Sequence, residues 1–477
     1  MDGLGPQARF IPHNSNFAET DLESTRRHLI KRLKSEVARV HRHESQSFHP
    51  SVYVETSGLV LMDWRVAGLD LPDIPPVELE ASARQACARM VRCVSLKPPK
   101  DASRVSFMET HVGCAAVLIV QHLTRPEGEK PLLDYHGYQR CVSVLRSAVK
   151  LALYRPVQSE NVPLTPYDGC EVLYGRAGLL YALLFLRSNV TAEIYSDAPP
   201  AEEIKTLTSF DTLRKLVDDV IDRGTMGADA TRPPGVAPSS WSPLMWCWHH
   251  KLYLGAAHGV AGILQMIVSC PLDTIAAHIP IVLQTVEWLL RVQCEDGNWS
   301  PKASEEPPTE KQELLQWCHG APGLVILFST ILKRAAELSV SPGFQTRLKS
   351  AVARASDLVY REGFLKKGVG LCHGVSGSVF TLLAASDVLD GRGKDSLPER
   401  FYQAVHLAVL GSHWHGMTRQ GELRRPDAPY SLYEGLSGLC CAYAAILERI
   451  SSDGEWRGLG SVFRGMPGYD DVMIQIN

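Results

Sequence analysis

The chain has 477 residues, of which 45% are hydrophobic and 21% are charged, and its formal net charge is −3 at pH 7. This composition is typical of a globular protein with ample material for a core. The nearly balanced charge excludes a global basic field for nucleic acid or an anionic membrane.

The N-terminus, Met1-Asp2-Gly3, has neither the basic start nor the apolar core of a signal peptide, and it lacks the second-position glycine that myristoylation needs. Strongly apolar stretches such as 178–186 run for nine residues, whereas a membrane span needs ~20. The twelve cysteines are scattered and form no CxxC, which is not the spacing of a disulfide scaffold. We therefore expect a cytoplasmic protein without a transmembrane segment.

The first predicted element is an amphipathic basic helix over residues 21–40, preceded by an extended arm. We interpret it as a helix that packs on the rest of the protein, with peripheral membrane contact as the alternative. We assign residues 1–60 to this arm and helix, 61–460 to the main fold and 461–477 to a C-terminal tail.

From residue 110 onward the main feature is a Gly-x-(small or Pro)-Gly element followed directly by an apolar run. Successive copies are 84, 61, 54 and 61 residues apart, and a degraded copy lies at 110–118. A period near 60 residues has room for two helices of ~15–20 residues. The five clear copies are Gly175–Gly178, Gly259–Gly262, Gly320–Gly323, Gly374–Gly377 and Gly435–Gly438.

The run after each glycine pair is apolar on nearly every face, which predicts a helix buried all round. Amphipathic segments at 213–223, 280–292 and 344–359 suit an outer layer, and β-type alternation is scarce. We predict an all-α fold, an α/α toroid of six to seven repeats with an inner and an outer ring of helices. The predicted loops are 224–243, 301–310 and 390–399.

Two of the copies carry a cysteine followed directly by a histidine, in Trp317–Gly323 and in Leu371–Gly377. A thiolate beside an imidazole is ligand chemistry that zinc prefers. The cysteines are 54 residues apart, so the fold must bring them together, which favours a reaction site over a local structural staple. The candidate ligands are Cys318, His319, Cys372 and His373.

In a closed ring all inner helices begin at the same rim, so residues beside the glycine pairs converge there. His258 takes the place of His319 and His373 in its own repeat and is a candidate acid or base. Glu171 and Glu434 also flank glycine pairs; each could orient a histidine or cap a helix.

Cations precede two of these segments, at Lys366-Lys367 and at Arg424-Arg425-Pro426-Asp427. Lysine and arginine there suit a substrate that carries carboxylates or phosphates, and a solvated surface is the alternative.

Together these motifs resemble the LanC-like proteins, the eukaryotic relatives of lanthionine synthetase C. The resemblance covers roughly residues 105–450. It rests on Cys170–Gly178, Gly255–Gly262, Trp317–Gly323, Gly370–Gly374 and Arg424–Gly435.

The resemblance implies a seven-repeat toroid with one Zn²⁺ held by Cys318, Cys372 and His373, and with His319 beside the metal but not bound to it. By the same matching, His258 is the acid/base histidine, and Glu171 stands where the bacterial cyclases carry an aspartate. The glutathione-contacting positions would be Lys367, Arg424, Arg425, Pro426, Asp427 and, at the N-terminus, Arg9.

The activity implied is addition of glutathione to dehydroalanine or dehydrobutyrine in formerly phosphorylated proteins or peptides, forming a thioether. Two alternatives stay open: a lanthionine-forming peptide cyclase, and a non-catalytic scaffold that binds glutathione and zinc. No leader-peptide-binding extension is evident, which counts against the cyclase. The joint presence of Cys318, Cys372, His373, His258 and Glu171 counts against an inactive scaffold.

Overall fold

A computed structural model of the chain describes residues 9–14, 21–43, 49–125, 128–154, 169–190, 199–304, 311, 314–391, 397–452, 455 and 465–472. Regular structure in these residues is helical, and β pairing is limited to isolated bridges. Among the described residues, no helix has both the length and the apolar character to cross a membrane.

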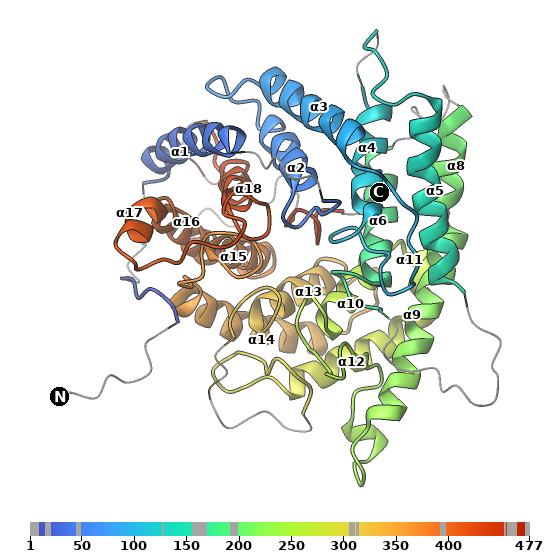
Figure 1. The fold of residues 1–477 in the computed structure, drawn as a ribbon. Coiled ribbons are helices and arrows are strands. Elements are labelled where there is room, and N and C mark those ends of the chain that lie inside the picture. The colour runs from blue at the N-terminus through green and yellow to red at the C-terminus, as the bar shows by residue number, and fades with distance from the viewer. Residues whose placement is uncertain are drawn as a thin grey trace.

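Seven helices in the described ranges form a closed inner ring (Figure 1). Each contacts the next along the chain, and the last contacts the first. They are α2 (Thr56–Ala67), α4 (His111–Leu123), α6 (Arg176–Asn189), α10 (Val260–Val268), α13 (Ala321–Lys333), α15 (Val375–Leu389) and α18 (Leu436–Leu447). Because these helices are apolar on nearly every face, they are buried on all sides.

An outer layer covers this ring, as the α/α toroid prediction requires. It comprises α3 (Pro76–Cys93), α5 (Tyr135–Ala152), α8 (Pro199–Leu207), α9 (Phe210–Thr231), α11 (Leu272–Ile275), α12 (Ile279–Arg291), α14 (Pro342–Glu362), α16 (Glu399–Gly411) and α17 (Trp414–Arg419), with short 3₁₀ turns at Pro238–Ser240 and Ala276–His278. The basic helix α1 (Leu22–Arg42) packs on α18. The first helix of the chain thus covers the last inner helix.

The structure corrects three of the predicted boundaries. The loop predicted from residue 224 begins later, because α9 continues to Thr231. The boundary predicted at residue 60 falls inside α2, which is an inner-ring helix. Residues 465–472, predicted to belong to a tail, pack inside the ring (red in Figure 1), where Tyr433 donates its hydroxyl hydrogen to the Pro467 carbonyl at 2.8 Å.

The second glycine of each repeat permits a close backbone approach. A Cβ on Gly178 would lie 2.2 Å from the carbonyl oxygen of Val172, six residues earlier. The same contact with the carbonyl six residues back recurs at all seven inner helices, including Gly58 in α2, where it is also 2.2 Å. The glycine is therefore needed for the tight turn that leads into each inner helix.

We expect Gly178→Ala to destabilise the protein by roughly 2–3 kcal/mol, because the added methyl group would overlap fixed backbone atoms. Gly416, in α17, is the matched control, since a Cβ there meets nothing within 4 Å. Gly416→Ala should stabilise by about 0.4–1 kcal/mol through the unfolded chain. Urea unfolding of both variants measures the effect, and a Gly178→Ala protein as stable as wild type would contradict the close-packing argument.

Candidate active site at the rim of the inner ring

The inner helices present their N-termini to one rim. The residue just before each helix N-cap occupies an equivalent place: Val54, Glu109, Tyr174, His258, His319, His373 and Glu434. Neighbouring loops are hydrogen-bonded to one another. Cys372 donates its N–H to the Tyr433 carbonyl at 2.8 Å, and Tyr433 donates to the Tyr53 carbonyl at 3.1 Å. The repeat therefore brings chemically different side chains to one shared rim.

The two cysteines predicted as metal ligands lie together there. The thiols of Cys318 and Cys372 are buried, free and hydrogen-bonded to each other. The hydrogen bond from Cys372, together with the Gln316 side-chain amide, which donates to the Cys318 sulfur at 3.0 Å, lowers the pKa of Cys318. Burial raises the pKa of Cys372. The contact with Cys372 therefore favours the ionised form of the Cys318 thiol.

Tyr53 also belongs to this cluster, and the sequence analysis missed it. Its hydroxyl group is hydrogen-bonded to Cys372, and burial raises the pKa of Tyr53. Tyr53 precedes its helix N-cap by two residues, as do Cys318 and Cys372. This repeat was not recognised in the sequence, because Gly58 has no partner glycine at position 55.

The two histidines that follow the cysteines are held in their neutral form. Burial and the Lys367 ammonium lower the pKa of His373 to about 4. Burial, His258 and Lys367 lower the pKa of His319 to about 4. The Nδ1 atom of His319 is buried without a hydrogen-bond partner, and its ring lies 5.2 Å from the Tyr253 ring and 6.4 Å from the His258 ring, centroid to centroid.

The donor chemistry for zinc is only partly assembled. Nowhere in the described ranges are three or more His, Cys, Asp or Glu side chains gathered so that they could hold a metal ion. The structure pairs Cys318 with Cys372 but does not complete a three-ligand group with His373. The donor types nevertheless fit Zn²⁺: two thiols are in contact, one of them with a lowered pKa, and the imidazole of the next residue after Cys372 is neutral.

His258 and Glu171, predicted from separate repeats, are in direct contact. Nδ1 of His258 lies 3.0 Å from Oε2 of Glu171. The same carboxylate accepts the backbone N–H groups of Leu173 at 2.8 Å and Tyr174 at 2.7 Å. Glu171 therefore does both things that the sequence left open: it stabilises the turn before α6 and it orients His258, whose Nε2 remains for chemistry.

Aromatic and charged residues that the sequence analysis did not predict surround this pair. Trp248 stacks on His258 with ring centroids 5.6 Å apart and planes at 7°, and the Arg104 guanidinium lies 4.2 Å from the centroid of the Tyr174 ring. Burial, with Glu434 and Glu171 nearby, raises the pKa of Glu109. Trp248 lies in a connection between repeats, so no repeat register indicated it.

The predicted glutathione-contacting residues come from three segments that lie side by side. Lys366 donates its backbone N–H to the Arg9 carbonyl at 3.0 Å, and Arg424 donates its backbone N–H to the Lys366 carbonyl at 2.8 Å. A Cβ on Gly368 would lie 3.4 Å from the Pro426 ring. Arg9, Arg424, Arg425 and Asp427 are exposed.

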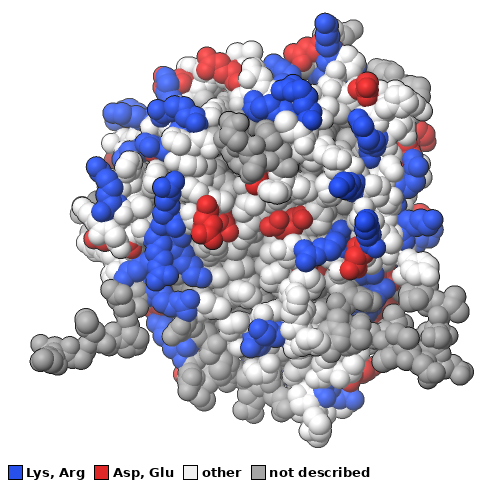
Figure 2. All heavy atoms as spheres, in the orientation of Figure 1, with Lys and Arg blue, Asp and Glu red and all other residues white. Residues whose placement is uncertain are grey.

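We call Arg9, Lys367, Arg424 and Arg425, four of the predicted glutathione-contacting residues, the basic ledge. Lys367 links it to the thiols, because its Nζ donates to the Gln316 side-chain oxygen at 3.1 Å and Gln316 donates to Cys318. Figure 2 shows Lys and Arg side chains in a continuous column beside Asp and Glu clusters that lie nearer the centre of this face. Further Lys and Arg side chains lie around the rest of this face, so the acidic side chains near its centre have basic ones on both sides.

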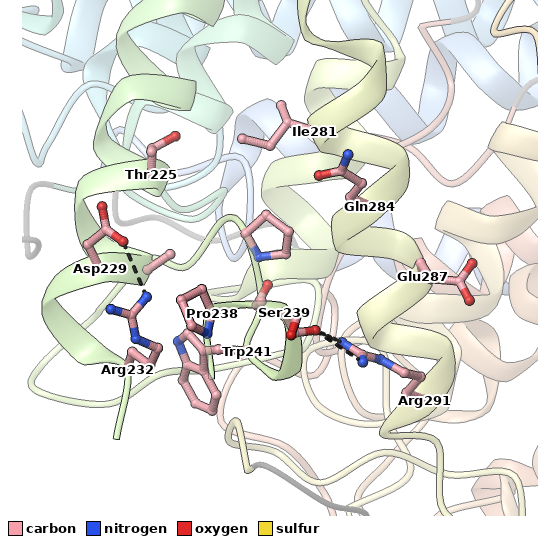
Figure 3. A pocket seen from close by; sticks show the side chains of 13 residues that line it. Thr225, Asp229, Arg232, Pro238, Ser239, Trp241, Ile281, Gln284, Glu287 and Arg291 are labelled. Carbon is pink, nitrogen blue, oxygen red and sulfur yellow. Dashed lines mark hydrogen bonds and ion pairs between the residues drawn. The ribbon is translucent and has the colours of Figure 1, made fainter. Parts of the chain in front are cut away.

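A cavity of about 600 Å³ lies away from the rim, between α9 and α12 (Figure 3). Arg232 pairs there with Asp229 at 3.6 Å, and Arg291 donates to the Ser239 carbonyl. None of the predicted site residues lines it. We therefore place the candidate chemistry at the rim and not in this cavity.

Comparisons with known proteins identify the family and support the fold. Residues 132–458 match the family model of lanthionine synthetase C-like proteins. The chain belongs to this family.

More particularly, it is 26% identical over 281 residues to glutathione S-transferase LANCL1 of Danio rerio, a match that covers 58% of this chain. The chain spans 59% of the length of that relative. In fold it is similar to nisin cyclase, with a TM-score of 0.51 and 14% identity, over 88% of this chain and 94% of the cyclase chain. That similarity supports the toroid fold.

Proposed function

We propose that the protein adds glutathione to dehydroalanine or dehydrobutyrine residues of proteins or peptides, forming a thioether. The observation that carries the proposal is the presence of the Cys318–Cys372 thiol pair and the His258–Glu171 pair on one rim. The name of the Danio rerio relative, a glutathione S-transferase, supports glutathione as the thiol. The twelve free cysteines suit a reducing compartment such as the cytosol.

Cys318, Cys372 and His373 would hold one Zn²⁺ in this proposal. When bound, it would act as a Lewis acid that keeps an incoming thiol ionised at neutral pH. The neutral state of His373, whose pKa lies at about 4, leaves a ring nitrogen free to ligate.

The proton in the reaction would come from His258. Attack of the glutathione thiolate on the β-carbon of the dehydroamino acid forms the C–S bond and leaves negative charge at the α-carbon and its carbonyl. Because the Glu171 carboxylate accepts the Nδ1–H of His258 at 3.0 Å, Nε2 would take up the proton that the glutathione thiol releases and then deliver it to the α-carbon. His319, with its unpartnered buried Nδ1, lies beside this path.

The basic ledge would bind the carboxylates of glutathione. Glutathione is an anion at neutral pH, and lysine and arginine side chains pair with carboxylates through charge-assisted hydrogen bonds. Lys367 is the member nearest the thiols, through Gln316, so it would place the glutathione sulfur close to Cys318.

We expect Lys367→Ala to raise the KM for glutathione by about tenfold, the loss of one charge-assisted hydrogen bond. Lys366→Ala is the matched control, because the contacts of Lys366 with Arg9 and Arg424 use its backbone atoms and survive the substitution; its KM should stay within about twofold of wild type. Initial rates at varied glutathione measure both variants. Equal changes in the two would contradict the specific role of Lys367.

The proposed function as a whole is tested by incubating the purified protein, with its zinc content determined, with glutathione and a dehydroalanine peptide. Mass spectrometry should detect the glutathione adduct at a rate well above that without enzyme. Glutathione binding without any adduct would favour the scaffold, and adduct formation within a cysteine-containing peptide alone would favour the cyclase.

A further inference from the structure

The connection between α9 and α10 contains a strained hairpin that the mechanism has not used. Trp248 donates its backbone N–H to the Lys251 carbonyl at 2.9 Å and accepts from the Lys251 N–H at 3.0 Å. The two residues at the tip, His249 and His250, have φ of 47° and 61°. Turns of this shape usually carry Asn-Gly, because side chains disfavour positive φ. Such strain persists only where surrounding structure enforces it, often beside a functional site.

The hairpin is fixed at both ends. On one side, Trp246 is buried and donates its indole N–H to the Val220 carbonyl of α9 at 3.0 Å. On the other side, Ala303 donates to the Leu252 carbonyl at 2.7 Å. The anchors therefore determine where the Trp248 ring lies, while His249, His250 and Lys251 are exposed.

The Trp248 ring lies against His258. The planes of Trp248 and His258 are 7° apart, and those of Trp248 and Tyr174 are 15° apart, with centroids at 5.6 and 5.7 Å. The Tyr174 and His258 centroids are only 6.3 Å apart. Stacking on opposite faces of the indole would separate them by about 7 Å, since each contact needs about 3.5 Å. Tyr174 and His258 therefore lie on the same side of Trp248.

We propose that the 248–251 hairpin is a positioning device for His258, and that Trp248 is its working side chain. The Glu171 carboxylate fixes the Nδ1 edge of the imidazole, and the indole fixes its plane. Together they leave the ring one orientation, with Nε2 toward the substrate. The inference rests on the proposed function only in giving His258 the role of proton donor; the ring geometry is independent of it.

The test compares Trp248→Leu, which removes the flat ring, with Trp248→Phe, which keeps one. Two measurements are made on each full-length protein: imidazole ¹⁵N NMR of His258, assigned with His258→Gln, and kcat and KM for the dehydroalanine peptide. We expect a single Nδ1–H tautomer in wild type and Trp248→Phe, and tautomer averaging in Trp248→Leu. In Trp248→Leu, kcat should fall by about tenfold or more, with KM within about twofold, because misplacing a reacting group costs rate.

A control keeps the hairpin and removes its exposed imidazoles. His249→Asn with His250→Gly supplies the usual residues of this turn, so the His258 signal and kcat should match wild type. A sharp single-tautomer signal with unchanged kcat in Trp248→Leu would overturn the proposal. So would loss of activity in the turn variant with an unchanged His258 signal. If wild type formed no thioether, the proposed function would fail while the NMR comparison still decided the role of the hairpin.

Discussion

Replacement of Cys372 by alanine is expected to abolish zinc binding and thioether formation together. The two thiols are buried and hydrogen-bonded to each other, so removing one leaves a single sulfur donor on this part of the rim. Even partners that only orient metal ligands cost 10- to 100-fold when lost. We therefore expect the rate of adduct formation to fall by at least about 100-fold. Elemental analysis and mass spectrometry on the same sample measure both effects.

The matched control for this experiment is Cys440→Ala. Cys440 is also a free, buried cysteine, but it lies within inner helix α18, and burial raises its pKa. This variant should keep one zinc per chain and wild-type adduct formation. Zinc retained in Cys372→Ala would contradict the ligand assignment. Zinc lost with adduct formation intact would contradict a role for the metal in the reaction.

The inner ring was largely predictable because one physical constraint repeats along the chain. Each inner helix needs a glycine where its first turn passes the carbonyl six residues earlier, and five glycine pairs displayed that constraint in the sequence. α2 obeys the same constraint through Gly58, but Glu55 stands where five of the other inner helices carry a first glycine. The helix was therefore hidden, although its geometry is equivalent.

The pairs of site residues were predictable from register, and the supporting residues were not. His258 and Glu171 occupy rim positions of neighbouring repeats, so the toroid alone brings them together. Trp248 reaches the site from a connection whose course no repeat dictates, whereas Lys367, which also lies in a connection, was predicted from its motif. The C-terminal segment was likewise hidden, because its place inside the ring depends on long-range contacts, such as that of Tyr469 with Trp317.

Glu171→Gln is expected to reduce kcat by roughly 10²- to 10⁴-fold, the range that a misplaced general acid costs. Glutamate offers two acceptor oxygens: one takes the Tyr174 N–H, and the other takes the Leu173 N–H and the His258 ring nitrogen. Glutamine has one oxygen and one NH₂ group. In the Glu171→Gln variant, the NH₂ group must therefore replace one of the two oxygens, where it points at a group that itself donates a hydrogen.

Either placement of the amide is costly, and the two costs differ. An NH₂ group toward Tyr174 breaks the turn before α6 and lowers stability by about 1–3 kcal/mol. An NH₂ group toward His258 forces the ring into the tautomer whose proton lies on Nε2 and leaves the Leu173 N–H unpaired. Glu171→Asp, which retains two acceptor oxygens, should recover part of the rate.

Glu434→Gln is the matched control. It also removes the charge of a carboxylate at the rim, but Glu434 does not have the double role of Glu171. Glu434 also lies at the rim, but among the described residues its side chain accepts one backbone N–H, that of Ala428 at 3.2 Å, which an amide oxygen can accept equally well. Its stability and kcat should therefore stay close to those of wild type. Steady-state kinetics and urea unfolding compare the three variants. If Glu171→Gln loses stability but keeps its rate, Glu171 serves only the turn; if it loses rate with stability intact, the carboxylate acts through His258.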